Sequence, residues 1–246
     1  MEFFDLVNIS EQFMELVNPI SPEKVMKVGE VSGLNQDSRV IEFGSGYGEV
    51  LALWAEAFGI SGIGIEIRDY ACQRATKKMQ ERGFANRIKI VCANAAGHEF
   101  EKHAFDVAAC VGATFIWDGF RSTIRAMREA VRPAGKLVIG EQYWQTDRVP
   151  SKYAKEEKAM LTELELLQII RDEGYDLEYV ARATHDEWDR YVTQDWHGLL
   201  RWIEENTNHP EREEVIRHFH MMQDKYVKYD REHMGWAMYV LKPIAY

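Results

Sequence analysis

Residues 40–50 of the chain read VIEFGSGYGEV, and this stretch decides the fold. A short strand-like run, VIEF, is followed at once by glycines at positions 44, 46 and 48 and then by helix-forming residues. Glycine lets the main chain turn tightly and lets a ligand approach it, while the free amides at the start of a helix favour an anionic group. The stretch therefore predicts a strand, a ligand-binding loop and a helix in direct succession.

Outward from this stretch, short apolar runs alternate with longer amphipathic ones. This is the pattern of a parallel sheet with helices on both faces. The predicted strands are residues 39–43, 60–67, 88–92, 105–111 and 135–140. The predicted helices are residues 49–58, 68–82 and 119–131, with a short or irregular stretch near 97–103. Pro133 and Gly135 should end the last helix and turn the chain into the fifth strand.

The second half of the chain carries two capping boxes, in which a Thr is followed three residues later by a Glu. Thr162 with Glu165 predicts a helix that ends at Gly174, and Thr184 with Glu187 predicts another. Further elements are expected as strands at 176–183 and 235–242 and a helix at 211–230. We expect one domain over 1–246, with a core at about 35–142, 161–183 and 233–242 and helical cap elements at about 1–34, 143–160 and 184–232.

Bulk properties exclude several classes of protein. With 246 residues, a net charge of −10 and no Lys/Arg block, the chain lacks the surface that neutralises phosphates, so a nucleic-acid partner is not expected. It shows neither a signal peptide nor an apolar run long enough to span a membrane. Three cysteines without a CxxC suit the cytoplasm, and the five histidines between 197 and 233 have no familiar metal-ligand spacing. We therefore expect a cytoplasmic protein without a metal.

Two further polar positions follow strands in the expected order. Glu66 ends the second predicted strand, where a doubly wound sheet places a carboxylate that accepts both ribose hydroxyls of a nucleoside. Asn94 and Ala95 follow the third, where a side-chain amide can pair with adenine. The dinucleotide fingerprint GxGxxG would need a glycine at position 49, which is Glu49, so nicotinamide binding is disfavoured.

Together these residues resemble the class I S-adenosylmethionine-dependent methyltransferases, whose first motif is acidic-x-Gly-x-Gly-x-Gly. The resemblance implies a Rossmann-like α/β fold with a seven-stranded, mostly parallel sheet and a reversed last strand. In that family the glycine loop holds the methionine part of the cofactor, the second acidic residue binds the ribose and the third-strand residue reaches the adenine. The cofactor-binding residues implied for S-adenosyl-L-methionine are Glu42, Gly44, Ser45, Gly46, Glu66, Ile67, Asn94, Ala95 and Val111.

A closer resemblance joins the chain almost end to end to a group of largely uncharacterised bacterial methyltransferases. It rests on NAAG at 94–97, DVAACVGAT at 106–114, GEQYW at 140–144 and EWDRY at 187–191. It strengthens the cofactor prediction and says little about the acceptor. The implied activity is methyl transfer (EC 2.1.1.-) to a small molecule through a nitrogen, oxygen or sulfur atom, in a deep pocket under the cap.

Residues just past strands four and five should face the acceptor, because ligands of open α/β sheets lie beyond the carboxyl ends of the strands. Glu141 and Tyr143 are the catalytic candidates, and Thr114, Trp117 and Trp144 are the substrate-binding candidates. A partly desolvated Glu141 could bind a cationic amine or act as a general base. The alternative is a carboxylate that pairs with an Arg or caps a loop. The tryptophans at 188, 196 and 202 are expected mainly to pack the cap helices.

Two other functions stay open on the sequence alone. One is a protein that binds S-adenosylmethionine without catalysis, because the binding motifs are visible while no essential base is. The other is a nicotinamide-dependent oxidoreductase, which the generic glycine loop suggests and the glycine spacing disfavours. The apolar residues Phe3, Phe4, Phe13 and Met14 further suggest that the N-terminal segment closes over the cofactor, so that deleting residues 1–18 would weaken binding.

Overall fold

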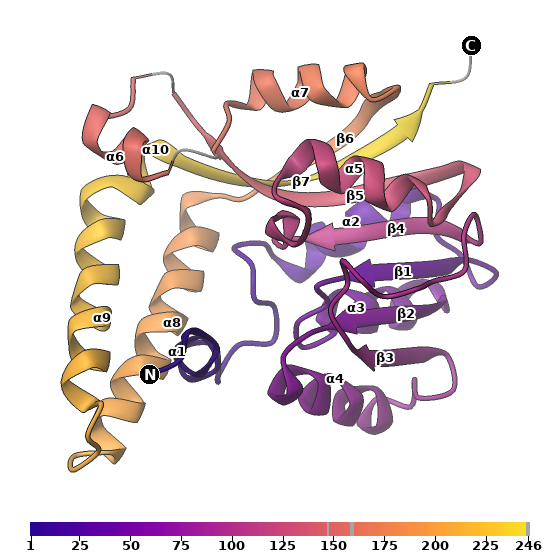
Figure 1. Ribbon diagram of the computed structural model, residues 1–246. Helices are drawn as coiled ribbons and strands as arrows, with labels where there is room; N and C mark the ends of the chain where they lie inside the picture. The colour runs from indigo at the N-terminus through magenta and orange to yellow at the C-terminus, as the bar shows by residue number, and fades with distance from the viewer. Residues whose placement is uncertain (147, 158–159, 245–246) are drawn as a thin grey trace.

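A seven-stranded sheet forms the centre of the protein, which is seen here in a computed structural model that describes residues 1–146, 148–157 and 160–244 (Figure 1). The strand order is β3-β2-β1-β4-β5-β7-β6. The first five strands run parallel, and β7 is antiparallel to both of its neighbours, β5 and β6. The strands are β1 (Arg39–Phe43), β2 (Ser61–Glu66), β3 (Ile88–Cys92), β4 (Phe105–Val111), β5 (Val131–Trp144), β6 (Tyr175–Arg182) and β7 (Met234–Pro243).

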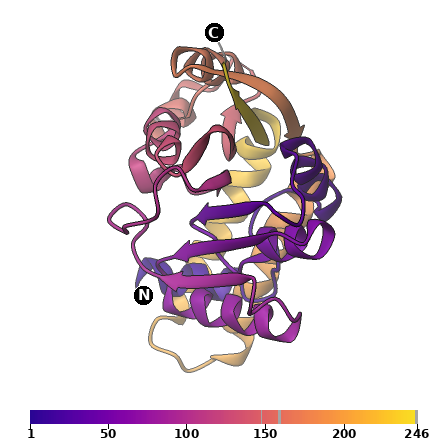
Figure 2. The same ribbon diagram turned by 90° about the vertical axis from the view of Figure 1, so that its right-hand side faces the viewer.

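Helices cover both faces of this sheet, and two buried clusters fill the spaces between them. One cluster joins the sheet to α2, α3 and α8, and the other joins it to α5 and α7. Figure 2 shows the sheet twisting from β1–β3 to the yellow β7, as sheets of L-amino acids do. The helices are α1 (Phe3–Ser10), α2 (Pro22–Ser32), α3 (Glu49–Phe58), α4 (Asp69–Glu81), η1 (Thr114–Trp117), α5 (Phe120–Arg128), α6 (Ser151–Glu156), α7 (Glu163–Asp172), α8 (His185–Glu205), α9 (Arg212–Lys225), the π-helical turn η2 (Tyr226–Asp230) and α10 (Arg231–His233).

Local signals in the sequence explain most helix boundaries. The Ser21 side chain caps α2, and both predicted capping boxes are present at the starts of α7 and α8. Gly174 adopts a φ of +80° just after α7, which is the left-handed conformation that commonly follows a helix. These starts and stops are confirmed, as is the α/β sheet that the alternation predicted. The reversed last strand, which the family resemblance implied, is confirmed too.

The fifth strand differs from its prediction at both ends. The preceding helix was expected to reach residue 131, but α5 ends at Arg128 and β5 already begins at Val131. Pro133 is tolerated because the pairing with β4 is irregular between Phe105 and Val107, so no ladder hydrogen bond is required from its nitrogen. At the other end β5 continues to Trp144 instead of stopping at 140, because β7 pairs with it from Leu137 to Trp144. Glu141, Tyr143 and Trp144, expected after the strand, therefore lie within it.

A set of helices stands beside the carboxyl ends of the parallel strands. The arrows of β1–β4 point toward α1 and α8, and α9 lies on the far side of α8 (Figure 1). The backbone of α1 comes very close to α8, since a Cβ atom on Gly198 would lie 2.3 Å from the carbonyl oxygen of Ser10. The helix α1 lies within the helical cap element expected at about 1–34. Residues 147, 158–159 and 245–246, which fall in the predicted ranges 143–160 and 1–246, lie outside the described residues.

Candidate active site

The glycine loop connects β1 to α3 in a shape that requires glycine. Gly44 and Gly46 have φ values of +69° and +52°, and a Cβ atom on Gly44 would lie 2.5 Å from the Cβ of Ala113. The amides of Gly44 and Ser45 donate to the carbonyl of Ile65 at 2.8 and 3.0 Å, which ties the loop to β2. Glycine is therefore favoured here by the left-handed backbone conformation and by the close packing of the loop against Ala113.

Glu66 faces this loop from the end of β2. The amide of Gly46 donates to its Oε2 at 2.9 Å, and the amide of Arg68 donates to its Oε1, also at 2.9 Å. The residue is only 5% exposed. Two main-chain donors thus fix the plane of a buried carboxylate at the edge of the loop, which is the geometry needed to accept a pair of hydroxyls.

Three other buried polar atoms at the end of β1 and in the loop have no hydrogen-bond partner among the described residues. They are Oε2 of Glu42, Oγ of Ser45 and the hydroxyl of Tyr47. Burial and the nearby Glu66 carboxylate raise the pKa of Glu42 well above its usual range. Leaving such an atom unsatisfied costs about 1–3 kcal/mol, so a segment that keeps three of them is suited to a polar ligand. An amino-acid group, such as the methionine part of S-adenosylmethionine, offers donors and acceptors of the required kind.

The remaining cofactor candidates lie at neighbouring strand ends. Ala95 is buried, whereas Ile67 and Asn94 are exposed beside it. Oδ1 of Asn94 accepts from the amide of Ala96 at 3.0 Å, which fixes the side chain in a local turn. Val111 ends β4 and is buried. The structure thus brings all nine predicted cofactor residues to the carboxyl ends of β1–β4 and the loops that follow them.

The segment that follows α1 covers this edge through contacts that no sequence motif signals. We call residues 11–18 the strap. Val17 lies over the glycine loop, because its Cγ2 would be 3.0 Å from a Cβ atom on Gly46. Asn18 donates to the carbonyl of Val111 at 3.2 Å. Arg74 of α4 donates to the carbonyl of Met14 at 2.5 Å. In the sequence, only the apolar side chains of Phe13 and Met14 indicated that this segment covers the site.

Thr114 and Glu141 meet on the acceptor side. The Thr114 hydroxyl donates to Oε2 of Glu141, and the amide of Gln142 donates to Oε1 at 2.8 Å. Burial raises the pKa of Glu141 above its ordinary value, although both hydrogen bonds act in the opposite direction. Within residues 1–146, 148–157 and 160–244, Glu141 forms no ion pair with an Arg or Lys. The structure therefore does not show the alternative in which Glu141 pairs with an arginine.

The other acceptor candidates are more widely spread. Trp117 packs edge-on against Phe43 with ring centroids 5.1 Å apart. Tyr143 belongs to the buried cluster under α5 and α7, whereas Trp144 packs edge-on against Tyr153 in the other cluster. Consecutive strand residues point to opposite faces, so Tyr143 and Trp144 lie on opposite sides of β5.

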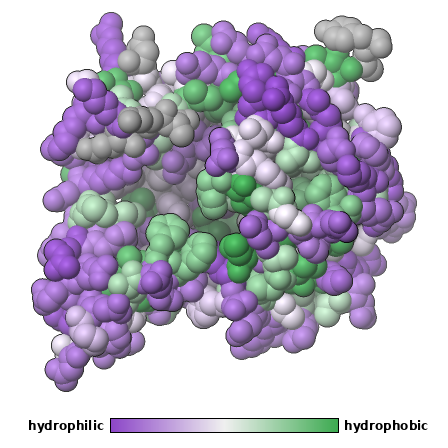
Figure 3. Space-filling view, viewed as in Figure 1, coloured by the Kyte–Doolittle hydropathy of each residue, from purple (hydrophilic) through white to green (hydrophobic). Residues whose placement is uncertain are grey.

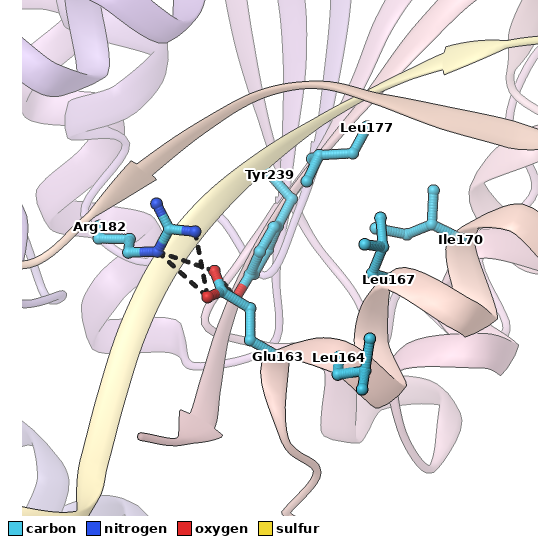
Figure 4. Close-up of a pocket in the computed structure, with 7 residues that line it drawn as sticks. All are labelled: Glu163, Leu164, Leu167, Ile170, Leu177, Arg182 and Tyr239. Atoms are coloured by element: carbon cyan, nitrogen blue, oxygen red, sulfur yellow. Dashed lines mark hydrogen bonds and ion pairs between the residues drawn. The ribbon is translucent and has the colours of Figure 1, made fainter. Parts of the chain in front are cut away.

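A separate pocket of about 240 Å³ lies between α7, β6 and β7 (Figure 4). Four apolar side chains line it, and an ion pair between Arg182 and Glu163 at 2.9 Å closes one side. Tyr239 points toward this pair. None of the predicted cofactor residues lines the pocket, so it is distinct from the glycine-loop site. Its full lining is Glu163, Leu164, Leu167, Ile170, Leu177, Arg182 and Tyr239.

The cap helices contribute aromatic side chains. Trp188 is 7% exposed and packs against Tyr191 and Tyr226, and Trp202 packs against His209. Figure 3 shows a hollow on this face of the molecule, between the α8 and α9 helices and the strand ends.

Within the described chain no group of three or more His, Cys, Asp or Glu residues is placed to hold a metal. No described helix is long and apolar enough to cross a membrane.

Comparison with known proteins agrees with this geometry. Residues 40–135 match the methyltransferase domain family. The uncharacterized protein YjhP of Escherichia coli is 32% identical over 98% of this chain and 99% of its own.

Two solved structures resemble the whole chain, and both are of S-adenosylmethionine-dependent methyltransferases in complex with S-adenosyl-L-homocysteine. The protein from Thiobacillus denitrificans is 32% identical with a TM-score of 0.92, covering 99% of this chain and 100% of the other. The protein from Geobacter sulfurreducens is 33% identical with a TM-score of 0.92, covering 98% of each chain. The chain therefore belongs to the family of S-adenosylmethionine-dependent methyltransferases.

Proposed function

We propose that this methyltransferase transfers the methyl group of S-adenosyl-L-methionine to a small-molecule acceptor held between the strand ends and the helices α1, α8 and α9. The observation that carries the cofactor half of this proposal is the buried Glu66 carboxylate, fixed by the amide of Gly46 against a loop that only glycine can form. The bound cofactor supplies an activated methyl group on a sulfonium, so the protein needs mainly to position its reactants.

Each of the nine predicted cofactor residues has a proposed role. Glu66 accepts the ribose hydroxyls, and Glu42 and Ser45 bind the amino-acid end through atoms that have no partner among the described residues. Gly44 and Gly46 supply the left-handed turns that bring the main chain of the loop beside Glu66. Oδ1 of Asn94 accepts a hydrogen bond within its own turn, so its side-chain nitrogen is the atom that donates to the adenine edge. Ile67, Ala95 and Val111 flank that edge.

Glu141 is the proposed catalytic residue on the acceptor side. Its carboxylate is buried enough for its pKa to be raised, and the Thr114 hydroxyl holds it in place. In the ionised form it can take a proton from the acceptor or bind an amine. Trp117 and Trp144 are proposed as flanking substrate contacts. Tyr143 is a weaker proposal, because its ring lies against Gly235 and its hydroxyl is near Arg182.

The proposal of a small acceptor rests on shape and charge. The strap and α8 stand over the strand ends, which leaves a hollow in place of an open groove (Figure 3). The net charge of −10 disfavours a polyanionic acceptor. We also propose a cytoplasmic location, because Cys72, Cys92 and Cys110 are free thiols.

A product assay tests this function. The purified protein is incubated with S-adenosylmethionine labelled in its methyl group and with pools of small amines, phenols, carboxylic acids and thiols. We expect S-adenosylhomocysteine and a labelled product to appear together with at least one pool, and neither to form with Glu66→Ala. Cofactor binding without transfer to any pool or to a metabolite extract would favour the non-catalytic alternative.

A further inference from the structure

Three buried side chains link the ribose carboxylate to the N-terminal segment. The guanidinium of Arg68 donates to Oε1 of Glu66 at 3.2 Å and to Oε2 of Glu11 at 2.7 Å. The side chains of Glu66, Arg68 and Glu11 are 6%, 9% and 12% exposed. A guanidinium that is enclosed in this way between two carboxylates is held much more firmly than a surface ion pair. Arg68 also donates to Oδ1 of Asn8 at 3.4 Å, at the end of α1.

Other contacts fasten the strap without touching Glu66. Arg74 donates to the carbonyls of Gln12 and Met14, and Lys78 pairs with Glu15 at 2.5 Å. These contacts hold the strap to α4. Among the described residues, Arg68 is the side chain that bonds both to the strap and to the proposed ribose carboxylate.

The carboxylate of Glu66 has a limited number of acceptor positions. An ionised carboxylate offers about four lone-pair sites. In this structure Oε1 accepts from the amide and Nε of Arg68, and Oε2 accepts from the amide of Gly46. Arg68 therefore helps to set the orientation of the carboxylate that a ribose diol would meet, and a substitution that removes its guanidinium also removes the bond to Glu11.

We propose that Arg68 is a positioning residue that couples closure of the strap to binding of the cofactor ribose. Its guanidinium holds Glu66 in the orientation that accepts the hydroxyls and binds Glu11, so that the strap closes over the occupied site. Because the strap reaches Val111 through Asn18, the same closure forms one wall of the proposed acceptor site. This inference rests on the proposed function, since it assigns the ribose to Glu66.

The coupling is tested by the kinetics of S-adenosylhomocysteine binding to the full-length protein and by hydrogen exchange of residues 11–18. The variants are Arg68→Gln, Glu11→Gln and the double variant. The matched control is Arg74→Gln, which removes a strap contact that does not involve Glu66. We expect each of the first two single changes to raise the dissociation rate of S-adenosylhomocysteine by about tenfold or more, because both release the strap. The double variant should be no worse than Arg68→Gln, since the two side chains act through one bond.

Hydrogen exchange supplies the readout that a purely structural role would not change. In the wild type the ligand should slow exchange in residues 11–18, and in Arg68→Gln it should not, even though the ligand still binds at saturating concentration. Arg68→Lys should restore only part of the protection, because an ammonium cannot form the same fork to two carboxylates. Arg74→Gln should loosen the strap equally with and without ligand.

Three results would overturn the inference, and a fourth would overturn its premise. Equal ligand protection of the strap in wild type and Arg68→Gln would contradict it, as would additive effects of the Arg68 and Glu11 changes. If Arg68→Gln fails to fold, Glu11→Gln carries the test alone, and an unchanged dissociation rate would then sink the proposal. Failure of the folded wild type to bind S-adenosylhomocysteine would instead refute the proposed function.

Discussion

Glu141 lies within β5 with one oxygen bonded to Thr114 and the other to the amide of Gln142. Burial raises its pKa, so its ionised form is lost at a higher pH than for an exposed glutamate. A base must be ionised to accept a proton, and kcat/KM should therefore fall as the pH drops through this raised pKa. We expect Glu141→Gln to lower kcat by about 10²-fold or more and to remove this acidic limb of the pH profile.

The matched control for Glu141 is Glu163→Gln, which alters a glutamate in the separate pocket between α7 and β6. Its kcat and pH profile should stay close to those of the wild type. A Glu141→Gln variant that keeps the wild-type profile would show that the carboxylate neither takes a proton nor binds a charged acceptor.

Asp195 is buried in α8, and burial together with Glu11 raises its pKa to about 6. The folded state thus binds this proton more tightly than the unfolded state, so the contribution of Asp195 to stability is greatest below its unfolded pKa and is lost as the pH rises to about 6. Asp195→Asn should therefore increase the free energy of unfolding at pH 8, by up to about 3 kcal/mol, and by less at pH 5. Urea denaturation at both pH values measures this.

Asp176→Asn, a change at an exposed position on β6, should produce no such difference between the two pH values. An Asp195→Asn variant that is less stable than the wild type at pH 8 would mean that the hydrogen bond from Ser10 to the carboxylate outweighs the cost of burying its charge.

At the scale of the elements, one carboxylate joins α2 to α8. Oε2 of Glu187 accepts from the amide of Thr184 in the capping box and from Nζ of Lys24 at 2.5 Å. Its Oε1 accepts from the amide of Ser21 at 2.9 Å, at the start of α2. In the corresponding box of α7, Glu165 bonds only to Thr162 among the described residues.

These two boxes form a matched pair for mutation. Glu165→Ala should lower the free energy of unfolding by about 1 kcal/mol, the usual cost of losing a helix cap. Glu187→Ala should cost about 2–4 kcal/mol, because it also leaves Lys24 and the amide of Ser21 without their partner. Urea midpoints give both values, and equal losses would contradict the view that Glu187 fastens the cap helix to the core.

Most elements could be predicted from the sequence because their signals are local. Strand runs, glycines and capping boxes act over a few residues, which is why Gly44, Gly46 and Glu66 could be placed at neighbouring strand ends before the structure was known. The full length of β5 could not be predicted in this way, because its last residues are held by β7, which pairs Trp144 with Met234. Arg68 and Glu11 were missed for the same reason, since 57 residues separate them in the chain.

At the scale of the whole molecule, the fold gathers one binding edge from segments far apart in the sequence. The carboxyl ends of β1–β4 supply the proposed cofactor site, the strap covers the glycine loop, and α8 stands beside both (Figure 1). The separate pocket between α7 and β6 lies outside this edge (Figure 4). The central claim is therefore that this edge binds S-adenosylmethionine and that Glu66 is its essential carboxylate.

The most direct test is a calorimetric titration of the folded protein with S-adenosyl-L-homocysteine, run beside NADH and repeated with Glu66→Ala. We predict saturable binding of S-adenosylhomocysteine by the wild type, no saturable binding of NADH, and loss of the first signal in a Glu66→Ala variant that remains folded. Binding of NADH alone, binding of neither ligand, or full affinity for S-adenosylhomocysteine without the Glu66 carboxylate would contradict the account.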